Sequence, residues 1–335
     1  MKSRFRWIAG SVVVLILIVL AYYRAGVLNL PSVPDEVTAT DAGLVGLDEM
    51  KNLEARIFSV NIPSSADSLT VEVQRAVSEI EYGNERNGIL HLQSLVRRNP
   101  ANIVLGNLLR METFKLTRLR LASNASQGEI GLVLPEYLDN QPMKFFRDLI
   151  KERPDRELKL QLALALVDHM LLFPALEIKA PASVESVEIL SDILRQSDPR
   201  AAFYVPALYA RGLNYLYRPF NLVWPERIAT APDAASKDLS LAVAIGQKVG
   251  GGSNALKAEL SLALGDAYAK EGKLNAAHSW WQLANNLAHD DRIRNRVFTR
   301  LQWKDEEVAA NLEATLEQQM NDTDHPLSDL RFMWR

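Results

Sequence analysis

The residues that could do chemistry in this chain are few: it has five histidines, some carboxylate pairs and no cysteine. A metal site or a histidine general base needs a second ligand or an orienting carboxylate close by. His278 and His289 stand eleven residues apart, which is roughly 16 Å along a helix axis and too far for one metal ion. Asp168 and His169 are adjacent in an apolar helical pattern, where neighbouring side chains point about 100° apart. We therefore expect no catalytic residues, no metal site and no cofactor.

Longer catalytic and nucleotide-binding motifs are absent from the sequence. It contains no His-Glu-x-x-His, P-loop, Gly-x-Gly-x-x-Gly or Gly-x-Ser-x-Gly pattern. The carboxylate pairs Asp290-Asp291 and Glu306-Glu307 lie at predicted helix ends, where acidic side chains favour the helix dipole or stay solvated. The sequence thus favours a binding protein over an enzyme.

The charge balance argues against one class of partner. Lys and Arg number 38 and Asp and Glu 41, so a net charge of −3 gives no overall field that would attract nucleic acid. One predicted helix carries a basic set: Arg110, Lys115, Arg118 and Arg120. We interpret this set as a solvated helix face, with an acidic partner or a lipid head group as the alternative.

The N-terminal segment has the composition of a membrane anchor. Residues 7–23 carry no charge and include an unbroken apolar run at 12–20, a length near the short end of what spans a bilayer. The alternative is a cleaved secretory signal, but the bulky Tyr22 and Tyr23 spoil the small-residue cleavage site. Lys2, Arg4 and Arg6 precede the span whereas Arg24 closely follows it. Because cytoplasmic flanks carry the excess of basic residues, the body is predicted to lie outside the cytoplasm, in the periplasm if the source is bacterial.

Apolar residues at helical spacing run through most of the chain after residue 63 and predict an all-α body. The predicted helices span residues 68–82, 84–98, 103–122, 142–153, 156–173, 184–196, 199–217, 232–249, 254–271, 274–289 and 306–320. No alternating strand pattern flanks a hairpin turn. We divide the chain into a cytoplasmic tip and anchor (1–25), a Pro- and Gly-containing tether (26–60), a helical domain (61–320) and a C-terminal tail (321–335).

One segment, residues 258–290, resembles a tetratricopeptide repeat, a pair of antiparallel helices. The residues that carry the resemblance are Gly265, Tyr268, Gly272, Ala277, Trp281 and Ala284. Small residues at 265 and 277 allow close approach of the paired helices, and the aromatic residues fill the space between units.

Two further copies are indicated by the same internal spacing. In the first, Gly83, Gly88, Leu92 and Leu95 stand 189 residues before Gly272, Ala277, Trp281 and Ala284. In the second, Leu208, Gly212 and Tyr215 stand 53 residues before Ser261, Gly265 and Tyr268, which leaves an insertion at 217–231. We therefore predict a tetratricopeptide-like α-solenoid following a single transmembrane helix.

The resemblance also implies where partners bind, because the first helix of each such unit lines the concave face. The candidates on these helices are Tyr209, Glu259, Asp266 and Lys270. The insertion adds the aromatic candidates Tyr217, Phe220 and Trp224, since aromatic residues commonly anchor interfaces.

These features predict a membrane-anchored scaffold or assembly factor whose partners are other proteins of the membrane or envelope. A structural subunit of a larger membrane complex fits the same sequence. An envelope hydrolase that uses carboxylates and His169 is the alternative from a different functional class.

The orientation of the body can be tested with a reporter fused after Arg335. A reporter that is active only in the cytoplasm should give no signal, because three of the four charges flanking the span precede it. The same fusion on a chain with the three N-terminal basic residues changed to Glu is the control, and a strong signal from the unchanged chain would contradict the topology.

Overall fold

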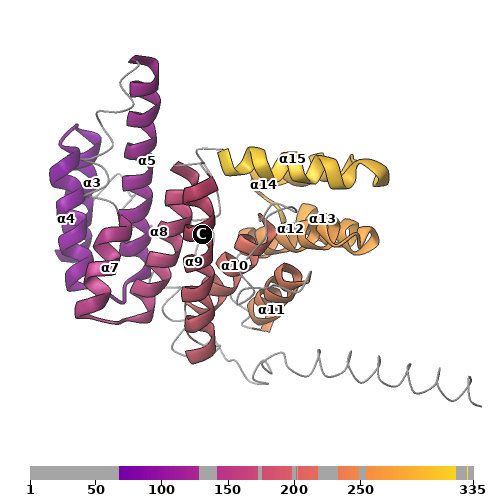
Figure 1. The fold of residues 1–335 in the computed structure, drawn as a ribbon, viewed down its shortest axis with the longest axis horizontal. Helices are drawn as coiled ribbons and strands as arrows, with labels where there is room; N and C mark the ends of the chain where they lie inside the picture. The colour runs from indigo at the N-terminus through magenta and orange to yellow at the C-terminus, as the bar shows by residue number, and fades with distance from the viewer. Residues whose placement is uncertain are drawn as a thin grey trace, which may run out of the picture. The chain divides into compact units, whose positions relative to one another are not determined.

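The structure is a computed structural model, and it describes residues 68–127, 142–172, 176–197, 201, 203–217, 233–248, 254–321 and 330. All of these residues belong to one compact unit that spans residues 38–335. Within these ranges the chain forms helices and no strand, so the predicted all-α class is confirmed there (Figure 1). The arrangement is compatible with an α-solenoid.

The bounds of the helices are as follows. They are α3 (Ser68–Glu81), α4 (Glu85–Arg98), α5 (Ile103–Gln127), α7 (Pro142–Glu152), α8 (Arg156–Leu172), α9 (Leu176–Gln196), α10 (Tyr204–Leu216), α11 (Ala234–Lys248), α12 (Asn254–Lys270), α13 (Leu274–Leu287), α14 (Asp291–Leu301), the 3₁₀ helix η2 (Asp305–Glu307) and α15 (Val308–Asn321).

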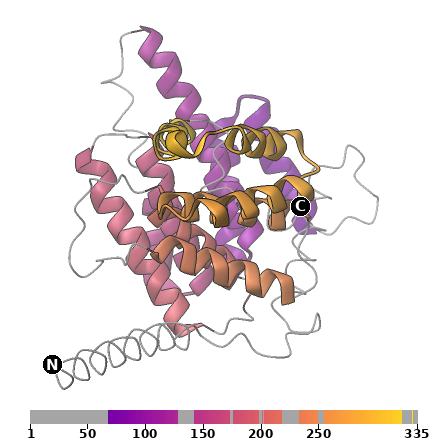
Figure 2. The ribbon, with the colours of Figure 1, turned by 90° about the vertical axis from the view of Figure 1, so that its right-hand side faces the viewer.

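The contacts between helices follow the order of the chain. Consecutive helices pack together from α3 and α4 through to α13 and α14. Some alternate helices are also in contact: α10 contacts α12, and α12 contacts α14. Figure 2 shows the helices from α11 onward as successive layers. This nearest-neighbour pattern is typical of stacked helical hairpins, in which each unit is stabilised by the next.

Two hairpins, α3–α4 and α12–α13, have equivalent turns 189 residues apart. Gly83 and Gly272 both adopt the left-handed conformation, with φ of 86° and 74°. The amide of Asn84 donates to the carbonyl of Glu79. In the second turn the amide of Lys273 donates to the carbonyl of Tyr268, and this donor and acceptor have the same separation in sequence as the first pair. Glycine is required at these turns because a side chain is strained at positive φ.

Small residues let the paired helices approach closely. A Cβ atom built on Gly265 would lie 2.4 Å from Trp281, and one on Gly212 would lie 2.9 Å from Leu239. The residues assigned to repeat packing that are buried are Leu92, Leu95, Gly212, Gly265, Ala277, Trp281 and Ala284. Tyr215 and Tyr268 are half-buried.

Helix α14 was not predicted from the sequence. Four arginines among its eleven residues hide the apolar pattern, which consists of Ile293 and Val297 on one face. Asp290 caps this helix by accepting a hydrogen bond from the amide of Arg292 at 2.6 Å. The helix is stabilised by its partners across the interface, which local periodicity does not show.

Two predicted helix starts differ from the structure by five residues or more. Helix α9 begins at Leu176, ahead of the predicted residue 184, and continues through Pro181. A proline inside a helix removes one backbone donor, which a helix that gains enough from packing tolerates. Helix α10 begins at Tyr204, later than the predicted residue 199, after a turn in which the amide of Tyr204 donates to Ala201.

Some predictions fall on residues that the structure does not describe. These are the anchor and tether at 1–60, the predicted insertion containing Phe220 and Trp224, and the tail apart from Asn321 and Leu330. Among the residues that are described, no helix is both long and apolar enough to cross a membrane.

The close approach at Gly265 can be tested by adding one methyl group. Gly265→Ala should lower the free energy of unfolding by about 1–3 kcal/mol, because the new Cβ overlaps Trp281. Ser279→Ala, on the exposed face of α13, is the control and should change it by less than about 0.5 kcal/mol. Equal urea midpoints for the two variants would contradict this packing.

Candidate functional site

The predicted partner-binding residues on the first helices do not form an open surface. Tyr209, Glu259 and Asp266 are buried, and Lys270 is half-buried. The expectation that the inner face of α12 is exposed is wrong, because α14 and α15 pack against this helix. Its side chains are therefore held by partners within the chain.

Two arginines of α14 bind the two carboxylates of α12. Arg296 Nη1 lies 2.9 and 3.0 Å from the two oxygens of Glu259. Arg300, fully buried, places its Nε 2.6 Å and its Nη2 2.7 Å from the oxygens of Asp266. Trp281 also donates its indole N–H to Asp266 at 2.9 Å. These bonds satisfy carboxylates that would otherwise be costly to bury.

The remaining described candidates, Tyr217 and Lys270, also make internal contacts. Tyr217 is buried and donates its hydroxyl to Gln319 of α15 at 2.7 Å, and burial raises its pKa well above the usual value. Lys270 donates to the carbonyl of Leu216, at the end of α10, at 2.6 Å. Both side chains link helices that are distant in the sequence.

A second buried polar cluster lies between α5 and α8 and is centred on Arg110. This side chain is fully buried and donates to three acceptors. The acceptors are Gln161 Oε1 at 2.9 Å, Asp168 Oδ2 at 2.7 Å and Asn107 Oδ1 at 2.9 Å. The prediction that Arg110 belongs to a solvated basic face is therefore wrong.

Helical spacing places these residues opposite one another. On α5, Asn107, Arg110, Phe114 and Thr117 follow at intervals of three or four residues. On α8, Gln161, Ala165, Asp168 and Leu172 do the same. Two such faces meet along their length when the helices pack, so polar groups at the same level can pair.

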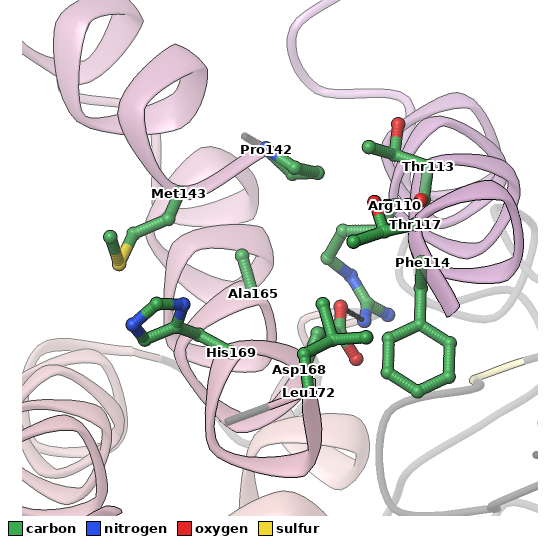
Figure 3. A pocket seen from close by; sticks show the side chains of 10 residues that line it. All are labelled: Arg110, Thr113, Phe114, Thr117, Pro142, Met143, Ala165, Asp168, His169 and Leu172. Atoms are coloured by element: carbon green, nitrogen blue, oxygen red, sulfur yellow. Dashed lines mark hydrogen bonds and ion pairs between the residues drawn. The ribbon is translucent and has the colours of Figure 1, made fainter. Parts of the chain in front are cut away.

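A small recess opens beside this cluster, between α5, α7 and α8, with a volume of about 20 Å³. It is lined by Arg110, Thr113, Phe114, Thr117, Pro142, Met143, Ala165, Asp168, His169 and Leu172. Figure 3 shows Arg110 meeting Asp168, with Met143 and His169 on the side away from α5. A space of this size holds about one water molecule or the end of a small side chain.

The chemistry available in the recess is limited. Burial lowers the pKa of His169 below its ordinary value, and the charge of Arg147 adds to this effect, so the imidazole is neutral near pH 7. Asp168 is bound to Arg110, and Figure 3 shows it apart from the His169 ring. Among the described residues no group of His, Asp and Glu could hold a metal ion.

The cluster also binds a residue from the other end of the chain. The backbone N–H of Leu330 donates to Asn107 Oδ1 at 3.1 Å, and both residues are buried. Sequence analysis did not predict that Arg110, Asn107 and Leu330 belong to this site. Asp168 within the apolar run of α8 was a usable signal, since a carboxylate there requires a partner.

Comparisons with known proteins identify no relative. The chain matches no protein-family model, and neither curated proteins nor solved structures give a significant match. The interpretation of its function therefore rests on its own residues and geometry.

The importance of the Arg110 cluster can be measured by removing its carboxylate. Asp168→Ala should lower the free energy of unfolding by about 3–5 kcal/mol, because a buried guanidinium loses its counter-ion. Asp192→Ala breaks the half-exposed pair with Lys159 and should cost less than about 1 kcal/mol. Urea unfolding of both variants measures the difference, and similar losses would show that Arg110 does not depend on Asp168.

Proposed function

We propose that this protein is a helical-repeat scaffold of the tetratricopeptide type that binds segments of other membrane or envelope proteins. Its N-terminal segment anchors it in the bilayer, and its helical body lies outside the cytoplasm. It acts by binding and assembly, without a cofactor and without nucleic acid.

The observation that carries this proposal is the equivalence of the two hairpins α3–α4 and α12–α13. The glycine of each turn adopts the left-handed conformation, and the two turns make equivalent backbone hydrogen bonds. Equivalent residues of the two hairpins are separated by the same number of residues in the sequence. A stack of such units forms an extended surface, which is the usual basis of protein binding by repeat proteins.

The partner surface is narrower than the sequence predicts. The inner face of α12 is occupied by α14 and α15, and Tyr217 takes part in that internal packing. Phe220 and Trp224, in the insertion outside the described residues, stay predicted partner contacts. In the described part, Tyr82, Leu119 and Phe298 are large apolar side chains more than half exposed to solvent, which makes them further candidates.

A hydrolase is the second candidate, and one observation favours it. His169 is neutral near pH 7 and lines a recess that also contains Asp168. Against it, the carboxylate is bound to Arg110, so it does not orient the imidazole as a general base requires.

Partner capture tests the scaffold proposal. The tagged full chain, cross-linked in cells and purified from solubilised membranes, should recover specific membrane or envelope proteins. The double variant Phe220→Ala, Trp224→Ala should lower that recovery several-fold, because aromatic anchors dominate interface energies, while helical content is unchanged. Tyr217→Phe is the matched control, since it removes the hydroxyl that binds Gln319 but keeps the aromatic ring, and it should leave recovery unchanged.

Two outcomes would contradict the scaffold proposal. One is equal recovery of partner proteins by the wild type and the double variant, which would show that the insertion does not contact a partner. The other is a His169→Ala variant that loses cellular function while folding and partner recovery stay normal, which would favour the hydrolase.

A further inference from the structure

Helix α15 is attached to the helical body along one face. It buries Val308, Leu312 and Leu316, which follow at intervals of four residues and are 1%, 0% and 3% exposed. Ala310 and Ala314, on the other side of the helix, are exposed. The helix packs on α12 (Figure 1, yellow). It is therefore an amphipathic helix seated on another helix of the same chain.

The surface beneath α15 also includes the end of α10. Tyr217, the residue after α10, donates its hydroxyl to Gln319 Oε1 of α15 at 2.7 Å. This hydroxyl lies in the field of Arg296 and Glu259, which form an ion pair between α14 and α12. We call Tyr217 and the face of α12 that α15 covers the α15 seat. An aromatic residue beside buried charges is a common anchor for a partner segment.

The chain that leads into α15 is anchored before it turns. The Trp303 ring meets the Trp281 ring edge to face, with centroids 5.9 Å apart, and the guanidinium of Arg300 lies 5.7 Å from the Trp303 centroid. Lys304 then has an extended backbone, and the exposed η2 follows. The hydrogen bonds of a 3₁₀ helix have poorer geometry than those of an α-helix. This connection can therefore act as a hinge while α14 keeps its contacts with α12.

The attachment of α15 is also weaker than that of α14. Separating α14 from α12 would break the buried ion pairs of Arg296 and Arg300 and leave charges without counter-ions. Helix α15 is held mainly by its apolar stripe and by the bond from Tyr217. Lifting it exposes one helix face and leaves the other helices packed, so it costs less than global unfolding.

We propose that α15 is a reversible occupant of the α15 seat, and that the partner segment which binds there is an amphipathic helix. The partner helix presents apolar side chains at positions i, i+4 and i+8, as α15 does with Val308, Leu312 and Leu316. When α15 detaches, it turns about η2 and exposes Tyr217 with the adjoining face of α12. The competition with a partner rests on the proposed function, whereas the detachment of α15 does not.

Thiol labelling of the full chain tests the detachment. The chain has no cysteine, so a single introduced thiol reports its own exposure. The thiol of Leu312→Cys should react with a maleimide at least about a hundredfold faster than that of Leu164→Cys, because α15 opens locally whereas the middle of α8 is exposed only on global unfolding. The two positions are matched, since both leucines are 0% exposed. Circular dichroism verifies that the helices are intact.

A second substitution in the Leu312→Cys chain tests the bond to Tyr217. Gln319→Ala should raise the labelling rate several-fold, because α15 loses the hydrogen bond that holds it to α10. Gln318→Ala, at the exposed neighbouring position, is the control and should leave the rate unchanged.

Added helix tests what the seat accepts. A peptide of residues 305–321, stapled at the exposed positions 310 and 314 to keep it helical, should raise the labelling rate of the Leu312→Cys chain several-fold. The reason is that the peptide fills the seat whenever α15 is detached and keeps α15 from returning. The same peptide carrying Leu312→Asp and Leu316→Asp should have no effect.

Each measurement can overturn one part of the proposal. Equal labelling of Leu312→Cys and Leu164→Cys would show that α15 does not detach. A rate that the stapled peptide leaves unchanged would show that the seat does not accept a second helix. A rate that falls with rising chain concentration, together with a dimer in light scattering, would mean that α15 is exchanged between two copies. None of these results depends on partner capture, so failure of the scaffold proposal would be recognised separately.

Discussion

The pairing of buried arginines is the constraint on which the arrangement of these helices depends. A guanidinium group stays charged at any accessible pH, so each one withdrawn from water must meet a carboxylate in good geometry. In the described part of the chain, four arginine–carboxylate pairs that are buried or largely buried join different helices: Arg110 with Asp168, Arg211 with Asp238, Arg296 with Glu259, and Arg300 with Asp266. The planar fork of arginine fixes both the separation and the rotation of the helices it connects.

These ion pairs determine which faces of neighbouring helices pack together. This effect is larger than their contribution to the free energy of unfolding. Helix α8 is apolar around much of its circumference, with eleven buried residues out of seventeen. Leucine and alanine alone would let such a helix pack in more than one register, because apolar contacts are not directional. Moving α8 by one turn against α5 would separate Asp168 from Arg110 and leave two charges buried without partners. The cost of that state excludes the alternative registers.

The same constraint shapes the surfaces that remain for function. On α12 the carboxylates Glu259 and Asp266 attract α14, and this closes a face that a helical-repeat scaffold could otherwise use. On α5 the carboxamide of Asn107, positioned by Arg110, keeps an oxygen for a backbone N–H. One charged network therefore fills a face of α12, whereas the other holds an acceptor for the backbone N–H of Leu330.

The sequence by itself determined the all-α class, most helix positions and the equivalence of Gly83 with Gly272, because periodicity and glycine turns are local properties. It did not determine α14 or the burial of Arg110, Glu259 and Asp266. A charged side chain has the same local pattern whether it faces water or a partner on another helix. Only the tertiary structure brings together residues such as Asn107 and Leu330, and so decides which polar groups face solvent and which form a site.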